Sequence, residues 1–175
     1  MQENDSAPLE LQASPSPQYQ YGRHEESPRR GKIFPSVVSR RLAPLNSNCI
    51  VCGSQNLNGL QLAFQAGSNG VSAAWVPKSG WESFEGTVHG GIITAVLDEA
   101  MSKAIIACGW EAFTVELRVR FRNRVAPGER LHVEGWIVGK HKRRILAEAS
   151  LAADTGRERA HAWATFLIPR DDSLS

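Results

Sequence analysis

One stretch of the chain decides its fold: residues 86–100, with the sequence GTVHGGIITAVLDEA. From Gly90 onward its apolar residues recur with the period of an α-helix, and the pattern continues to about Cys108. The apolar stripe consists of Ile93, Val96, Leu97, Ala100, Ala104 and Ile105. Such a stripe predicts an amphipathic helix that buries one face, and Gly109 is well placed to end it.

Stretches in which apolar and polar residues alternate, as they do in β-strands, lie on both sides of this helix. Two precede it, at residues 59–66 and 71–76, and a loop at 78–88 leads into the helix. Four follow it, at residues 113–125, 131–140, 145–153 and 160–168. Only one helix is available to cover a face of an antiparallel sheet. We therefore predict an α+β fold in which a curved antiparallel sheet of about six strands wraps round one central long helix.

The two ends of the chain differ in composition from the middle. Residues 1–47 contain six of the nine prolines and seven serines, with few aliphatic side chains. Such a segment buries too little apolar surface to offset its chain entropy, so we predict a disordered or loosely docked tail. Within it, residues 33–43 could dock on the domain or on a partner. The predicted domain spans residues 48–170, and residues 171–175 form a short C-terminal tail.

Composition and charge exclude several classes of protein. Twenty basic and eighteen acidic side chains give a net charge of +2, which is too balanced for a protein that binds nucleic acid or an anionic membrane. No apolar run reaches the roughly 18 to 20 residues of a membrane span, and the N-terminus lacks the pattern of a secretory signal. Three cysteines are too few for a disulfide scaffold, so we predict a protein of the reducing cytoplasm.

The start of the helix and Asp98 within it are best suited to chemistry. Unpaired N–H groups of a first helical turn stabilise a developing oxyanion, and Gly90 and Gly91 let other groups approach the backbone closely. Asp98 interrupts a continuous apolar stripe between Leu97 and Ala100. The residues alone also fit a plainer interpretation, in which His89 and Asp98 are ordinary solvated or satisfied polar side chains.

The motif His89-Gly90-Gly91 followed by Asp98, in this order of strands, resembles the hotdog-fold acyl-CoA thioesterases, closest to their phenylacetate-pathway and thioesterase-superfamily-member branch. The resemblance covers residues 48–168. The lead-in CIVCGSQNLNGL at 49–60 is similar to the Cys-x-x-Cys-Gly and Asn-x-x-Gly-Leu pattern of some members, and later segments match at 113–117, 127–129 and 154–156. The resemblance implies a hotdog fold and a hydrolase that converts an acyl-CoA to a free acid and coenzyme A, without a cofactor.

The resemblance also implies roles for four residues. Asp98 matches the catalytic carboxylate, which acts as general base or nucleophile. The backbone amide of Gly90 matches the donor that polarises the thioester carbonyl, and His89 matches the histidine beside it. Thr114 matches the hydroxyl that orients the water or the carboxylate.

Ser83 departs from the family pattern. Many members have Asn or Gln six residues before the histidine, and serine stands at that position here. Because a serine side chain is shorter, it is less able to orient the substrate. Glu82 or Glu85 could take its place.

The geometry of the helix predicts a dimer. Eight residues separate Gly90 from Asp98, which is about 12 Å along a helix axis. One thioester carbon must lie about 3 Å from both the oxyanion donor and the attacking group. A two-fold partner meets this requirement if the helices pack antiparallel and bring Gly90 of one chain near Asp98 of the other. We therefore expect a homodimer, or a dimer of such dimers, with sites between subunits.

Cys49 and Cys52 have the spacing of a zinc knuckle, but a structural zinc needs four ligands. Cys108 is the only other cysteine, and no paired histidine motif follows it. We therefore expect no metal, and a turn that holds two small, partly buried thiols.

Two groups of basic residues are candidates for binding the phosphates of coenzyme A. The first consists of Lys140, Lys142, Arg143 and Arg144. The second is the row of arginines at 118–124, a pattern that is also typical of a solvated strand face.

Hydrolysis of an acyl-CoA is the favoured function, and two alternatives stay open. A hotdog hydratase or dehydratase also uses a histidine with a carboxylate, but usually in a different motif context. The His-Gly-Gly motif with Asp98 nine residues after His89 favours the thioesterase. The other alternative is a non-catalytic acyl-CoA-binding module; a DNA-reading regulator is disfavoured because the N-terminal segment is too rich in proline for a helix-turn-helix. No motif specifies the acyl group.

Overall fold

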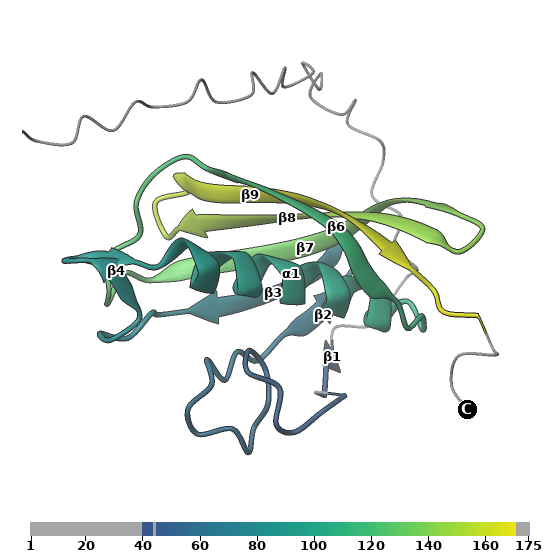
Figure 1. Ribbon diagram of the computed structural model, residues 1–175, viewed down its shortest axis with the longest axis horizontal. Coiled ribbons are helices and arrows are strands. Elements are labelled where there is room, and N and C mark those ends of the chain that lie inside the picture. Colours follow the sequence, from purple (N-terminus) through teal and green to yellow (C-terminus); the bar gives the residue numbers. More distant parts are fainter. Residues whose placement is uncertain (1–39, 44, 171–175) are drawn as a thin grey trace, which may run out of the picture.

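A seven-stranded antiparallel sheet curves round one long helix in this computed structural model, which describes residues 40–43 and 45–170 (Figure 1). This architecture confirms the predicted hotdog fold. In spatial order the strands are β1 (Arg40–Arg41), β2 (Gln65–Gly67), β3 (Gly70–Trp75), β7 (Leu131–His141), β8 (Arg144–Ala153), β9 (Glu158–Leu167) and β6 (Phe113–Phe121). The predicted C-terminal tail and most of the predicted N-terminal tail lie outside the described residues.

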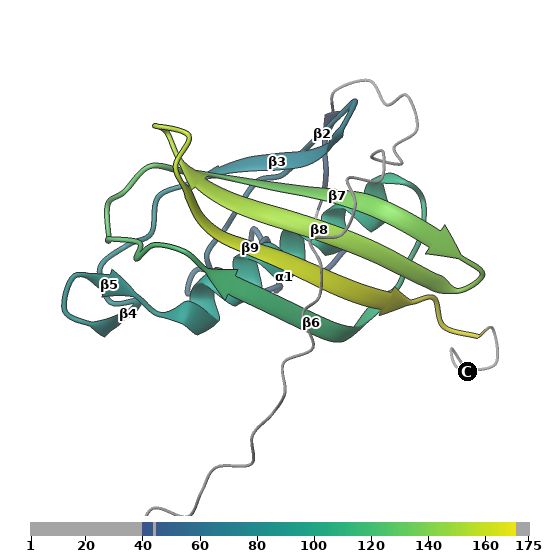
Figure 2. The same cartoon turned by 90° about the horizontal axis from the view of Figure 1, so that it is seen from above.

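The helix α1 (Gly90–Ala107) packs against the concave face of this sheet, as predicted (Figure 2). All six residues of the predicted stripe are buried, and they meet the inward-facing side chains of β7, β8 and β9. His89 is the N-cap and Cys108 the C-cap. Gly109 follows with a φ of +81°, the left-handed conformation that commonly ends a helix and favours glycine.

The helix and sheet approach each other closely at Gly135 of β7. A Cβ atom at this position would lie 2.3 Å from the carbonyl oxygen of Ala100 in α1, far inside van der Waals contact. Glycine at 135 therefore sets the spacing between α1 and the centre of the sheet.

Two stretches differ from the predicted elements. Residues 59–64 keep the alternation of buried and exposed side chains, but pair with irregular backbone: Leu62 N–H donates to Val51 O (2.8 Å), and Phe64 O accepts from Leu42 N–H (2.9 Å). The predicted loop at 78–88 contains a hairpin of β4 (Glu82–Phe84) and β5 (Thr87–Val88). Strands this short show no measurable period in a sequence.

The sheet begins before the predicted domain start at residue 48. Arg40 and Arg41 of β1 pair with Ala66 and Gln65 of β2, and the side chain of Leu42 is buried. This short stretch of the segment 33–43 is thus docked on the edge of the sheet. In the described part of the chain, no helix is long and apolar enough to cross a bilayer.

Candidate functional site

Asp98 and Thr114 meet between α1 and the edge strand β6. Thr114 Oγ1 donates a hydrogen bond of 2.8 Å to Asp98 Oδ1. Asp98 lies in the middle of the helix and is half-buried, whereas Thr114, in the second position of β6, is exposed. The structure therefore brings together two of the four residues to which the sequence resemblance assigned a role.

A β-bulge turns Thr114 toward the helix. Strict alternation along residues 113–125 would place Thr114 on the same face as Arg118 and Arg120, but the structure places it on the opposite face. Thr114 pairs with Phe166 of β9, and Glu116 pairs with Thr165, so that Val115 is the extra residue. Since a bulge reverses the facing of the residues before it, Thr114 shares the inward face of buried Phe166.

The environment of Asp98 raises the pKa of its carboxyl group above the ordinary value. Burial is the main cause, because it disfavours the charged form. The hydrogen bond from Thr114 acts in the opposite direction and lowers the pKa, while the negative charge of Glu99 raises it further. Asp98 Oδ1 is held by Thr114, which leaves Oδ2 for a reacting group.

The start of α1 is organised by His89. Its Nδ1 accepts a hydrogen bond of 2.8 Å from Gly91 N–H, and its backbone N–H donates to Trp81 O at 2.7 Å. A ring nitrogen that accepts from a backbone amide carries no proton, so the ring proton of neutral His89 lies on Nε2. Within the described residues, no hydrogen bond engages Gly90 N–H. This amide is free to donate to an oxyanion.

A single chain does not bring Gly90 to Asp98. Asp98 lies eight positions after Gly90, which corresponds to about 12 Å of helix. Gly90 lies instead against Phe121, at the other end of β6: a Cβ at Gly90 would be 3.3 Å from Phe121 Cζ. β6 is an edge strand, and its apolar residues Phe113, Val115 and Phe121 are exposed in the monomer.

The hairpin β4–β5 holds the position where the family pattern has Asn or Gln. Ser83 lies in β4 with an exposed side chain. Glu82 closes the hairpin, because its Oε1 accepts a 2.7 Å hydrogen bond from Gly86 N–H. Of the two carboxylates considered as substitutes for Ser83, Glu82 is thus engaged within its own hairpin, and Glu85 is exposed.

The four basic residues near 140 are all exposed in or beside the turn between β7 and β8. Arg143 Nε donates to Ile168 O (2.7 Å), and Lys140 Nζ lies 5.2 Å from the ring centre of Trp110. Among the described residues, none of the four forms an ion pair with a carboxylate. Their charges are available to an anionic ligand.

This basic turn lies at the same end of the sheet as Thr114. Thr114 pairs with Phe166 of β9, which pairs with Ile145 of β8, the residue after Arg144. Two strand spacings correspond to about 10 Å. A ligand at Asp98 and Thr114 is therefore within reach of the turn.

In the row of arginines at 118–124, Arg118 and Arg120 are exposed on the opposite face of β6, and Arg122 and Arg124 are exposed in the loop that follows it. Arg118 lies over the ring of Trp163, 5.7 Å from its centre, and Arg122 forms an ion pair with Glu158. Two of the four arginines thus have partners within the sheet, which favours the solvated strand face.

Cys49 and Cys52 lie in a turn as predicted, and both thiols are free and partly buried. Nothing in the sequence connects this turn with α1, where Cys49 Sγ lies 3.7 Å from Glu99 Oε2. Lys103 of the same helix, not predicted as a buried residue, is 2% exposed. A charged residue between the buried helical positions Met101 and Ala104 was the available signal.

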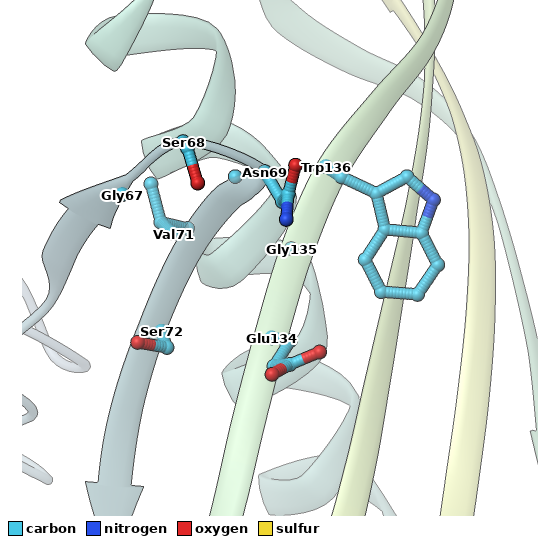
Figure 3. A pocket seen from close by; sticks show the side chains of 9 residues that line it. Gly67, Ser68, Asn69, Val71, Ser72, Glu134, Gly135 and Trp136 are labelled. Atoms are coloured by element: carbon cyan, nitrogen blue, oxygen red, sulfur yellow. The ribbon is translucent and has the colours of Figure 1, made fainter. Parts of the chain in front are cut away.

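A hollow of about 240 Å³ lies elsewhere, between the β2–β3 turn and β7 (Figure 3). Ser72, Glu134 and Trp136 line it from the face of the sheet that points away from α1. It shares no residue with the site around Asp98.

Known proteins show the following similarities. The family model described as thioesterase superfamily matches residues 85–160. A solved thioesterase-superfamily protein has a TM-score of 0.67 and 20% identity, covering 69% of this chain; the chain spans 60% of that protein's length. Zebra fish thioesterase superfamily member 2 has a TM-score of 0.61 and 17% identity, covering 67% of this chain and 90% of that one. A Streptococcus mutans protein bound to acetyl CoA has a TM-score of 0.55 and 19% identity, covering 57% of this chain and 80% of that one.

No curated protein sequence matches the chain. The resemblance seen in the sequence is confirmed at the level of the superfamily model and of the fold. The family model covers the helix and the strand that hold Asp98 and Thr114.

Proposed function

We propose that this hotdog-fold chain, similar to the thioesterase superfamily, is an acyl-CoA thioesterase that hydrolyses its substrate to a free acid and coenzyme A. One observation is central to this proposal: a half-buried carboxylate, Asp98, whose pKa is raised and which is oriented by the hydroxyl of Thr114. A raised pKa brings a carboxylate closer to the range in which it exchanges protons near neutral pH. Groups perturbed in this way are typical of catalytic sites.

In the proposed reaction Asp98 provides the attacking group. As a general base, its free Oδ2 removes a proton from water, and the water oxygen attacks the thioester carbon. As a nucleophile, the carboxylate attacks that carbon itself and forms a mixed anhydride, which water then hydrolyses. In both routes the carbon–sulfur bond breaks and coenzyme A leaves as the thiol. An acyl adduct on the Asp98 peptide after rapid acid quenching would identify the nucleophilic route.

The oxyanion donor in this proposal is Gly90 N–H of a second subunit. This amide belongs to the first turn of α1, where N–H groups and the helix dipole favour negative charge. The length of the helix separates it from Asp98 of the same chain. The exposed apolar edge of β6, which passes both Thr114 and Gly90, supports pairing with a second copy. We therefore propose that the active form is at least a dimer.

The acyl-CoA phosphates are proposed to bind at the β7–β8 turn. Its basic side chains have no carboxylate partner among the described residues, and the turn lies on the Thr114 side of the sheet. The similarity in fold to a protein bound to acetyl CoA agrees with a ligand of this class.

A panel of acyl-CoAs with aliphatic and aromatic acyl groups tests the function, with release of free thiol as the readout. We expect turnover of at least one member, and a decrease in kcat on the order of 10²-fold or more in Asp98→Asn. Asp154→Asn, which removes an exposed carboxylate in the β8–β9 turn, is the matched control and should stay within a few-fold of wild type.

Three outcomes would contradict the proposal. Consumption of an enoyl thioester without release of thiol would identify a hydratase. Binding of acyl-CoAs without turnover of any, at concentrations that saturate the protein, would identify a binding module. An Asp98→Asn variant with nearly full activity would remove Asp98 from the mechanism.

A further inference from the structure

Three side chains that can bind a metal gather where the loop 45–60 meets the middle of α1. They are Cys49, Cys52 and Glu99, and one ligand atom of each lies within 4.8 Å of the other two. None of them belongs to the proposed catalytic site. The fold brings Glu99, which is distant in the sequence, next to the two cysteines as a third possible ligand.

The turn around the cysteines presents both thiols to the same side. Gly53 N–H donates to Cys49 O (2.9 Å), and Val51 N–H donates to Cys49 Sγ (3.4 Å). A Cβ at Gly53 would lie 2.4 Å from Cys49 N, so the turn closes this tightly only with glycine. Backbone N–H groups directed at a sulfur are the outer contacts that orient a metal-binding thiolate.

The distances fit tetrahedral coordination. Zinc–sulfur and zinc–oxygen bonds of about 2.3 and 2.1 Å place a sulfur and an oxygen ligand about 3.6 Å apart in a tetrahedron. Cys49 Sγ and Glu99 Oε2 are 3.7 Å apart. The ion would fit between them and Cys52 with small movements of the side chains.

Lys103 balances the charge of such a site. Its side chain is 2% exposed, its Nζ lies 3.6 Å from Glu99 Oε1, and it donates to Ala43 O at 3.2 Å. The two oxygens of Glu99 thus divide their contacts, with Oε2 facing the thiols and Oε1 facing the ammonium group. A divalent ion, two thiolates, one carboxylate and one ammonium group have no net charge, as a partly buried site requires.

We propose that Cys49, Cys52 and Glu99 bind one divalent zinc ion, which joins the loop 45–60 to α1. Thiolate ligands select zinc over hard cations such as magnesium and calcium. Among the described residues, no other histidine, cysteine or acidic side chain completes the group, so a water molecule or an external ligand takes the fourth position. The cysteine and histidine motifs alone predict no metal, because Glu99 lies 47 positions after Cys52 and belongs to no such motif.

The test uses the full chain, reduced and freed of metal by a chelator, and titrated with Co²⁺ as a spectroscopic probe. We expect one equivalent of Co²⁺ to produce the near-ultraviolet absorption of thiolate-to-cobalt charge transfer, and one equivalent of Zn²⁺ to abolish it. Zinc should also raise Tm and protect Cys49 and Cys52, but not Cys108, from alkylation by iodoacetamide.

Variants assign the ligands. Cys49→Ser and Cys52→Ser should each lose the absorption, and Glu99→Gln should weaken binding on the order of 10-fold or more. Cys108→Ser is the matched control and should retain full binding. Wild-type chain that gives no charge-transfer absorption with stoichiometric Co²⁺ would overturn the proposal, whatever the variants do. Equal absorption in wild type and the Cys49→Ser/Cys52→Ser double variant would overturn it as well.

Discussion

Thr114 Oγ1 donates a hydrogen bond to Asp98 Oδ1, and this bond joins the edge strand β6 to the middle of the central helix. Its effect is opposite to that of the burial around Asp98. Burial raises the pKa of the carboxyl group, and the hydroxyl group lowers it. The proton affinity of the proposed catalytic group thus depends on two opposing effects, burial and the hydrogen bond from Thr114.

Replacement of Thr114 by valine should make activity more sensitive to acid. Without the hydrogen bond the pKa of Asp98 rises further, and the ionised carboxylate is lost at a higher pH. The acidic limb of kcat/KM against pH should move to higher pH, with a loss on the order of 10-fold on that limb. Thr114→Ser, which keeps the hydroxyl, should restore the wild-type profile. Identical profiles for Thr114→Val and wild type would show that the bond has no role in catalysis.

Asp98→Asn should stabilise the protein at neutral pH. Because burial raises the pKa of Asp98 in the folded state, that state binds more protons than the unfolded chain between the ordinary and the raised pKa. Stability therefore falls as pH rises through this window, and the penalty is complete above it. The variant should have the higher free energy of unfolding in urea at pH 7, and the difference should vanish below the ordinary aspartate pKa of about 3.9. A variant less stable than wild type at pH 7 would contradict this.

Gly90→Pro should remove the proposed oxyanion donor and leave the helix intact. Gly90 is the first residue of α1, where proline is well tolerated, and His89 has the extended backbone (φ −59°, ψ 131°) that proline requires before it. We expect kcat to fall on the order of 10²-fold. Gly90→Ala places the same Cβ against Phe121 but keeps the N–H, and should stay within a few-fold of wild type. Equal losses in both variants would indicate a steric effect.

Mixing Gly90→Pro and Asp98→Asn chains tests whether two subunits share a site. In a mixed dimer one site has both defects and the other has neither. Random exchange of equal amounts should therefore restore about a quarter of wild-type activity, because half of the dimers are mixed and each has one intact site. The mixed species is identified by copurification with a tag on one variant. Mixed dimers without activity would place both groups in one chain.

The basic turn should affect substrate binding more than turnover. Neutralising Lys142 and Arg144 with glutamine should raise KM for acyl-CoA several-fold and leave kcat nearly unchanged, because a remote phosphate contact is equal in ground and transition states. Added salt should reduce the effect, since both side chains are exposed. Arg143 is spared because its Nε holds Ile168 O. Arg157→Gln, in the β8–β9 turn at the other end of the sheet, is the control. A KM that is unchanged at low salt would show that the phosphates bind elsewhere, and the arginines at 118–124 would be the next candidates.

The helix and the long strands could be predicted because each has a regular period and ends at a clear turn. All six apolar residues of the stripe are buried, and Gly109 has the positive φ expected after a helix. The pairing of Thr114 with Asp98 could be stated only from the family resemblance, since alternation alone turned Thr114 the wrong way. A bulge adds one residue without changing the types of residue around it, so the sequence gives no sign of where the facing reverses.

The cluster of Cys49, Cys52 and Glu99 could not be predicted from the sequence, for a different reason. Cys49 and Glu99 are fifty residues apart, and their contact depends on how the loop 45–60 folds over the helix. That loop has no period, and its backbone hydrogen bonds run within the loop itself and to Leu62. Only the charge of Lys103 within a buried stripe marked this side of the helix in advance.

The contact between Gly135 and Ala100 determines which substitutions the protein can tolerate at position 135. Ala100 follows Asp98 by two residues, so a side chain at 135 that displaced this turn of the helix would move the carboxylate away from Thr114. In a library of random substitutions, position 135 should therefore behave like positions 98 and 114: variants that are still expressed and folded would be inactive. Gly135, which lies in the sheet and has no access to substrate, would thus be constrained by catalysis as strictly as by folding.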